Sequence, residues 1–116
     1  MKEIKNAIVQ VAMEAMDDKK AENIVALDIH ELDGTICDYF VICHASSSIQ
    51  VGAIADNVER ELILKLKEKP LRVQGQQNGL WIAMDYGNVM VHIFLDEMRE
   101  FYNMDELWAD AEKITL

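Results

Sequence analysis

Two turn dipeptides between residues 71 and 95 restrict the fold more than any other feature of this chain. Asn78-Gly79 and Gly87-Asn88 each interrupt a run rich in apolar and β-branched residues. Such dipeptides are typical of two-residue β-hairpin loops, because Gly and Asn tolerate a positive φ. Pairing outward from the two loops sets three cross-strand pairs: Arg72 with Asp85, Trp81 with Phe94, and Met84 with Val91. The sequence therefore predicts three antiparallel strands in a defined register.

This register divides the side chains between two faces of a sheet, because neighbouring residues of a strand point to opposite sides. One face is wholly aliphatic and is predicted to be core: Val73, Leu80, Ile82, Met84, Val91, Ile93 and Leu95. The other face is mixed: Arg72, Gln74, Gln76, Trp81, Asp85, Met90, His92 and Phe94. Aromatic and Met side chains beside charged ones are typical of a partner-binding surface. The alternative is a sheet face covered by another helix of the same chain.

The hydrophobic periodicity before this segment predicts four further elements. They are an amphipathic helix over residues 2–18, a half-buried strand from Val25 to near Glu31 that precedes an Asp33-Gly34 turn, an apolar central strand over Tyr39–Cys43, and a longer helix that follows Ser46–Ser48 and stops before Pro70. Helices and strands alternate in this order in α/β domains. We expect one α/β domain over residues 1–116, built on a mixed β-sheet with helices.

After Leu95 the spacing becomes helical again. Met98, Phe101 and Tyr102 line one side of a predicted short helix. Asn103, with Glu106 three residues later, has the pattern of a capping box that opens a last helix. On that helix the inward positions are expected to be Met104, Leu107, Trp108 and Ala111, and the outward ones Asp105, Glu106, Asp110 and Glu112.

The net charge of -10 indicates the kind of partner. Half of it lies in residues 96–116, which carry seven acidic side chains and two basic ones (7 − 2 = 5). Such a field repels nucleic-acid phosphates and attracts a basic protein surface. We therefore expect no direct nucleic-acid binding. The alternative is that the acidic surface only keeps the protein soluble.

No apolar run approaches the roughly 18 residues that a membrane helix needs, and the first residues do not have a signal-peptide pattern. A cytoplasmic protein with no membrane partner is expected. Cys37 and Cys43, if both lie on the predicted central strand, are about 20 Å apart, too far for a disulfide or a shared metal. We expect buried free thiols in a reducing compartment.

Catalytic and metal-binding patterns are weak. A buried strand followed by a Ser-rich turn and a helix is similar to the nucleotidyltransferase fold, whose active members need two carboxylates, typically two residues apart on one strand. The chain has no such pair, because Asp85 stands alone, and it has no phosphate-binding Gly-rich motif. Asp28, His30, His44 and His92 lack the spacing of a metal site. The prediction is a protein without catalytic residues, cofactor or metal; a nucleotidyltransferase-type enzyme acting on a nucleotide or small metabolite is the alternative.

Several short motifs follow one another in order from about Asp28: DYF at 38–40, DYG at 85–87, VHIF at 91–94, R-x-F-Y at 99–102 and L-W-x-D-A at 107–111. Together they resemble the Iojap family, the bacterial ribosomal silencing factors. The resemblance implies a nucleotidyltransferase-like fold without the catalytic carboxylate pair. It also implies binding to the large ribosomal subunit, through a basic ribosomal protein on its inter-subunit face, so that joining of the small subunit is blocked and translation is repressed. Homodimers are known in the family, and a homodimer is a further expectation.

The mixed face and the resemblance together predict the partner-binding residues: Trp81, Asp85, Tyr86, Met90, His92, Phe94, Arg99 and Tyr102. The sequence departs from the family pattern at three places. His44-Ala45 stands where Gly is common, Gln74 replaces a usual Glu, and Asn88 replaces a usual Asp. The last two changes remove negative charge from the predicted binding edge.

Overall fold

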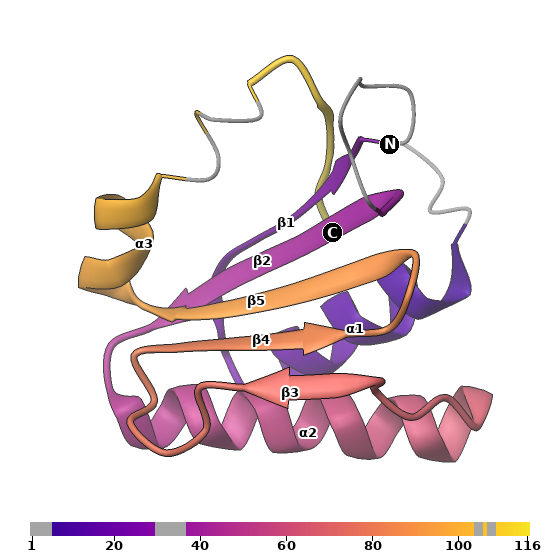
Figure 1. Ribbon diagram of the computed structural model, residues 1–116, viewed down its shortest axis with the longest axis horizontal. Helices are drawn as coiled ribbons and strands as arrows, with labels where there is room; N and C mark the ends of the chain where they lie inside the picture. Colours follow the sequence, from indigo (N-terminus) through magenta and orange to yellow (C-terminus); the bar gives the residue numbers. More distant parts are fainter. Residues whose placement is uncertain (1–5, 30–36, 104–105, 107–108) are drawn as a thin grey trace.

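The computed structural model describes residues 6–29, 37–103, 106 and 109–116. Its elements in chain order are α1 (Ala7–Asp18), β1 (Glu22–Asp28), β2 (Tyr39–Ala45), α2 (Ser48–Leu66), β3 (Arg72–Gln74), β4 (Trp81–Asp85), β5 (Val89–Leu95), α3 (Asp96–Tyr102) and β6 (Glu112–Ile114). Within these residues, six strands form one sheet in the order β3-β4-β5-β2-β1-β6. α1 and α2 cover the same face of the sheet, and α3 lies beside the ends of β2 and β5 (Figure 1).

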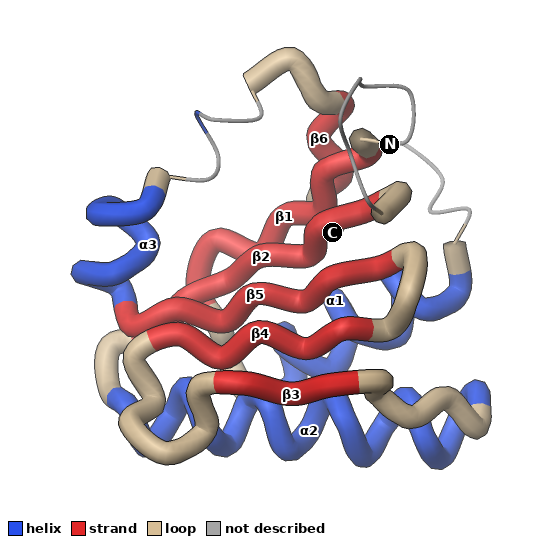
Figure 2. The backbone as a smooth tube through the Cα atoms, viewed as in Figure 1, coloured by secondary structure: helices blue, strands red, loops and turns tan. Residues whose placement is uncertain are grey.

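The sheet is mixed, as predicted. β2 and β5 lie side by side at its centre (Figure 2). These two strands run parallel, and the other neighbouring strands are antiparallel. Val41 and Cys43 of β2 pack toward the helices, and Ile42 packs on the opposite side. All three side chains are fully buried, which confirms a central strand covered on both faces.

α1 begins at Ala7 because Asn6 caps it. The Oδ1 atom of Asn6 accepts hydrogen bonds from the backbone N–H groups of Ile8 (3.0 Å) and Val9 (3.2 Å), and Asn is among the preferred residues at this position. The helix thus begins later than the predicted residue 2, while its end at Asp18 agrees with the prediction. Residues 1–5 lie outside the described part of the chain.

The Ser-rich turn that precedes α2 caps the helix. The Ser47 hydroxyl accepts a hydrogen bond from the Gln50 N–H (3.1 Å). The helix ends at Leu66, where Lys67 adopts a left-handed conformation with φ of 57°. The apolar residues that recur at helical spacing along α2 are all buried: Val51, Ile54, Ala55, Val58 and Leu62.

The hairpin register is confirmed, with all three predicted cross-strand pairs present. In the loop between β4 and β5 only Gly87 has a positive φ, of 87°, which is the pattern of a two-residue type II′ turn. The loop between β3 and β4 is longer than predicted. It spans residues 75–80, and Gly75 and Gly79 are its residues with positive φ.

Gly75 must be glycine in this loop. A Cβ atom there would lie 1.9 Å from the carbonyl oxygen of Trp81. The loop therefore returns close to the start of β4 without forming the predicted two-residue Asn78-Gly79 hairpin.

The aliphatic face of the hairpins packs under the helices. Its central members are fully buried or nearly so: Ile82, Met84, Val91 and Ile93. Leu80 was wrongly predicted to be core, because 41% of its surface is exposed. It belongs to the loop, where strand alternation does not apply. Leu95, at the end of β5, is half-buried.

The first strand and the C-terminal segment differ from prediction. β1 ends at Asp28 rather than near Glu31, and residues 30–36, with His30 and the predicted Asp33-Gly34 turn, lie outside the described residues. The sequence predicted helix through Glu112, but β6 begins there and pairs with β1. Non-local pairing here outweighs a local helical pattern. Residues 104–105 and 107–108, including the predicted inward positions Met104, Leu107 and Trp108, also lie outside the described part.

Both cysteines are buried free thiols. Cys43 lies within β2, whereas Cys37 precedes that strand. Burial raises the pKa of Cys37 to about 11 and that of Cys43 to about 12. Both thiols therefore stay protonated near neutral pH, and this makes them poor nucleophiles.

Candidate partner-binding site

β4 and β5 bring most of the predicted site residues onto one sheet face. Trp81 pairs with Phe94, Asp85 pairs with Met90, and His92 lies between these pairs on the same face. This face is opposite the one that α1 and α2 cover. The register counted outward from the two turns therefore correctly predicted which of these side chains share a face.

Aromatic side chains form a cluster on this face. The rings of Trp81 and Phe94 stack with centroids 5.0 Å apart and an interplanar angle of 22°. Phe40 contacts His92 edge-on, with centroids 5.1 Å apart. Phe94 is fully buried and His92 is 4% exposed, whereas Trp81 and Phe40 are half-buried. The half-buried rings thus lie on a buried layer that holds them in place.

A hydrogen bond fixes the orientation of the Trp81 indole. Its Nε1–H donates to Nδ1 of His92 over 3.1 Å. Since the indole nitrogen is only a donor, His92 must be neutral, with its own proton on Nε2. Burial lowers the pKa of His92 from 6.5 to about 4. The imidazole is therefore an uncharged acceptor at neutral pH.

Two residues of this cluster were not among the predicted site residues. Phe40 comes from β2 and Met98 from α3, and both pack against the buried cluster that includes Phe94. Phe40 pairs with Met90 across the parallel β2–β5 ladder. No turn joins these two strands, so their register cannot be counted from the sequence. The helical spacing placed Met98 on one side of the predicted short helix but could not identify the residues against which that side packs.

Asp85 and Tyr86 have structural contacts. The Asp85 carboxylate accepts a hydrogen bond from the Gly87 N–H (2.8 Å) and so closes the β4–β5 turn. Tyr86 packs in the core between the sheet and the helices and is 6% exposed. Burial, with a smaller contribution from Glu59, raises the pKa of its phenol. The structure thus places Tyr86 away from the mixed face, although it was predicted as a partner-binding residue together with members of that face.

Arg99 and Tyr102 lie on α3. Arg99 Nη1 donates to the backbone carbonyl of Asn23 (2.7 Å) and lies 3.0 Å from Nδ1 of His44. Tyr102 is the last residue of α3, and its side chain lies outside the described part. Arg99 is therefore engaged with the protein's own sheet.

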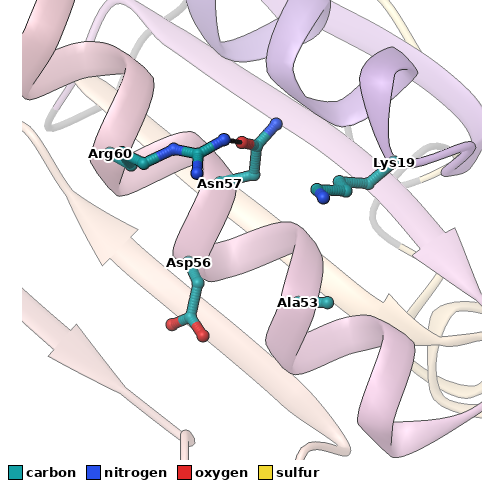
Figure 3. Close-up of a pocket in the computed structure, with 5 residues that line it drawn as sticks. All are labelled: Lys19, Ala53, Asp56, Asn57 and Arg60. Atoms are coloured by element: carbon teal, nitrogen blue, oxygen red, sulfur yellow. Dashed lines mark hydrogen bonds between the residues drawn. The ribbon is translucent and has the colours of Figure 1, made fainter.

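A surface hollow of about 260 Å³ lies on the opposite side of the molecule, where the end of α1 meets α2 (Figure 3). Asn57 lies nearly buried beside it. Its amide donates to the Ala15 carbonyl (2.9 Å), and its Oδ1 accepts from Arg60 (2.7 Å). The first bond joins α2 to α1, and the second lies within α2. Sequence reasoning missed Asn57, because a polar residue on the inward side of a helix breaks the apolar pattern.

The described residues contain no group of three His, Cys, Asp or Glu side chains placed to hold a metal ion. None of the helices in that part of the chain is long and apolar enough to cross a membrane. The fold and the site define a small α/β domain with a half-exposed aromatic face held in place from beneath.

The sequence matches the protein family described as "Ribosomal silencing factor during starvation" over residues 2–116. The chain belongs to this family, which confirms the resemblance that its motifs indicated.

Two relatives and one solved structure show how far the similarity extends. The chain is 38% identical over 112 residues to Ribosomal silencing factor RsfS of Halalkalibacterium halodurans, covering 94% of this chain and 92% of that protein. It is 40% identical over 108 residues to the protein of the same name from Bacillus subtilis, covering 90% and 87%. A crystal structure of a Chromobacterium violaceum protein matches with a TM-score of 0.83 and 30% identity, covering 93% and 88%.

Proposed function

We propose that this protein represses translation by binding the large ribosomal subunit. Its partner there is a basic ribosomal protein on the inter-subunit face, and the bound protein sterically blocks joining of the small subunit. The observation that carries the proposal is the Trp81 indole, half-buried on a sheet face and fixed by His92 and Phe94. An immobilised aromatic side chain loses little entropy on binding and is typical of interface hot spots.

The proposed partner-contacting part of the face is narrower than the sequence suggested. Trp81, Asp85 and Met90 are partly exposed and are the proposed contacts from β4 and β5, with Phe40 beside them. His92 and Phe94 are buried and act from beneath by holding the indole. Tyr86 is left out because it packs in the core between the sheet and the helices. Tyr102 stays a prediction.

The proposal is for a protein that acts by occlusion, without catalysis, cofactor or metal, in the cytoplasm. Its net charge of -10 favours a basic protein surface over nucleic acid. The nucleotidyltransferase-like description of the fold and the homodimer both stay predictions. A Mg²⁺-dependent rise in melting temperature with nucleoside triphosphates would instead favour the enzyme alternative.

We expect the purified protein to sediment with isolated large subunits and not with joined ribosomes, since occlusion requires the inter-subunit face to be free. The measurement is its distribution across a sucrose gradient loaded with subunits or with joined ribosomes. Equal recovery with both particles would refute occlusion.

We also expect association with the large subunit to slow as salt rises. Charges more than about 8 Å apart are screened at physiological ionic strength, and electrostatic attraction acts mainly on the association rate. Between low and high salt the association rate constant should fall by roughly tenfold or more, as measured by stopped-flow or surface binding. A rate constant independent of salt would mean that the acidic surface serves only solubility.

A further inference from the structure

Arg99 anchors α3 to a distortion in β1. The register between β1 and β2 shifts between Glu22 and Val25, and Asn23 within this interval has a left-handed φ of 50°. A bulge of this kind re-aims a strand's backbone groups. The Asn23 carbonyl accepts the hydrogen bond from Arg99 Nη1 at 2.7 Å.

The same guanidinium group also contacts β2. Arg99 Nη1 lies 3.0 Å from Nδ1 of His44. Because Arg has no acceptor atom, Nδ1 of His44 must accept, and the proton of a neutral His44 is on Nε2. That nitrogen lies 3.8 Å from the Glu22 carboxylate. The Arg99 contacts therefore span the ends of β1 and β2, beside which α3 lies (Figure 1).

Docking of α3 also affects the aromatic face. Met98, next to Arg99, packs against the buried cluster that includes Phe94, and Trp81 packs against the same cluster. A shift of α3 would withdraw Met98 and loosen the layer beneath the indole. The Arg99 anchor and the proposed binding surface are thus linked through one adjacent side chain.

We propose that Arg99 is a positioning residue: it holds α3 on the β1 bulge and thereby keeps Trp81 in its binding orientation, rather than contacting the partner itself. This inference rests on the proposed function. A direct contact role fits poorly, because a cation does not favour a basic partner. Charge alone predicts that removing Arg99 from a chain of net charge -10 would strengthen binding. A positioning role predicts instead that removing Arg99 weakens binding.

The experiment measures large-subunit affinity and the amide hydrogen exchange of α3. Arg99→Gln should weaken binding by roughly tenfold, since a hydrogen bond from a charged group is lost, and should speed exchange in α3. Arg99→Lys should not restore wild-type affinity, because a single ammonium group does not reproduce the planar guanidinium fork. Lys65→Gln is the matched control. It makes the same charge change on the exposed side of α2, so it should leave hydrogen exchange in α3 at the wild-type value and should not weaken binding.

Two variants at the bulge test the contact without changing charge. Asn23→Gly keeps the backbone acceptor and favours the left-handed conformation, so its affinity should equal that of the wild type. Asn23→Val disfavours that conformation and should weaken binding as Arg99→Gln does. The double variant Asn23→Val with Arg99→Gln should bind no more weakly than either single variant, because both substitutions break the same contact.

Folded Arg99→Gln protein that binds as tightly as the wild type, or full rescue by Arg99→Lys, would overturn the positioning role. Wild-type protein that fails to bind large subunits would instead overturn the proposed function. Hydrogen exchange would then still test whether Arg99 holds α3 in place. Unchanged protection of α3 in Arg99→Gln would show that it does not.

Discussion

Ile82→Ala should lower the free energy of unfolding by about 2–5 kcal/mol, the usual cost of a cavity left by a buried Ile. Ile82 is 1% exposed beneath the helices. Its neighbour Trp81 points to the opposite face, where it is half-buried. Trp81→Ala should therefore cost less stability, but about 2 kcal/mol or more of large-subunit binding, as at interface hot spots.

Melting temperature and large-subunit affinity, measured for both variants, test this contrast between adjacent residues. Trp81→Phe is a useful control, because it keeps a ring on Phe94 while removing the N–H group that binds His92. It should retain more affinity than Trp81→Ala. If Trp81→Ala lowers the melting temperature as far as Ile82→Ala does and the folded protein still binds normally, the indole is core and the proposed surface is wrong.

Acidification should destabilise the protein through His92. Its pKa falls from 6.5 to about 4 on folding because burial disfavours the imidazolium ion. A depressed pKa means that the unfolded chain binds the proton more readily. The contribution to stability is thus complete above pH 6.5 and is lost as the pH falls toward 4, amounting to about 3 kcal/mol. Protonation also removes the acceptor for the Trp81 indole.

Denaturant unfolding of wild type and His92→Phe between neutral and acidic pH isolates this effect. The variant loses the indole's acceptor, so it should be less stable at neutral pH, but it has no group to protonate at this position. Carboxylate titration affects both proteins alike, so the difference between their stabilities should shrink as the pH falls. Parallel stability curves would mean that His92 is not held neutral by burial.

The sequence predicted the hairpin register because two short turns link the strands and side-chain parity can be counted outward from them. It could not predict that Phe40 joins the aromatic cluster, since β2 and β5 are parallel and no turn sets their alignment. Leu80 was assigned to the core because a loop of residues 75–80 was read as two residues. Tyr86 was grouped with the site by motif, although it packs under the helices.

β6 shows a different limit. Three residues do not contain a recognisable strand pattern, and this strand exists because β1 offers a free edge. Similarly, the Arg99 anchor depends on a bulge at Asn23 that no local signal marks. The elements predicted best are those set by neighbours in the sequence, and those missed depend on partners far along the chain.

The pairing of β1 with β6 has a consequence for synthesis. Asp28 of β1 pairs with Glu112, so this sheet edge stays unpaired until almost all of the described residues have been translated. An unpaired edge is a template for association with another chain. Contacts this distant also slow folding, because a long loop must close before they form. The nascent polypeptide therefore exposes this edge of β1 to association with other chains until residues 112–114 leave the exit tunnel.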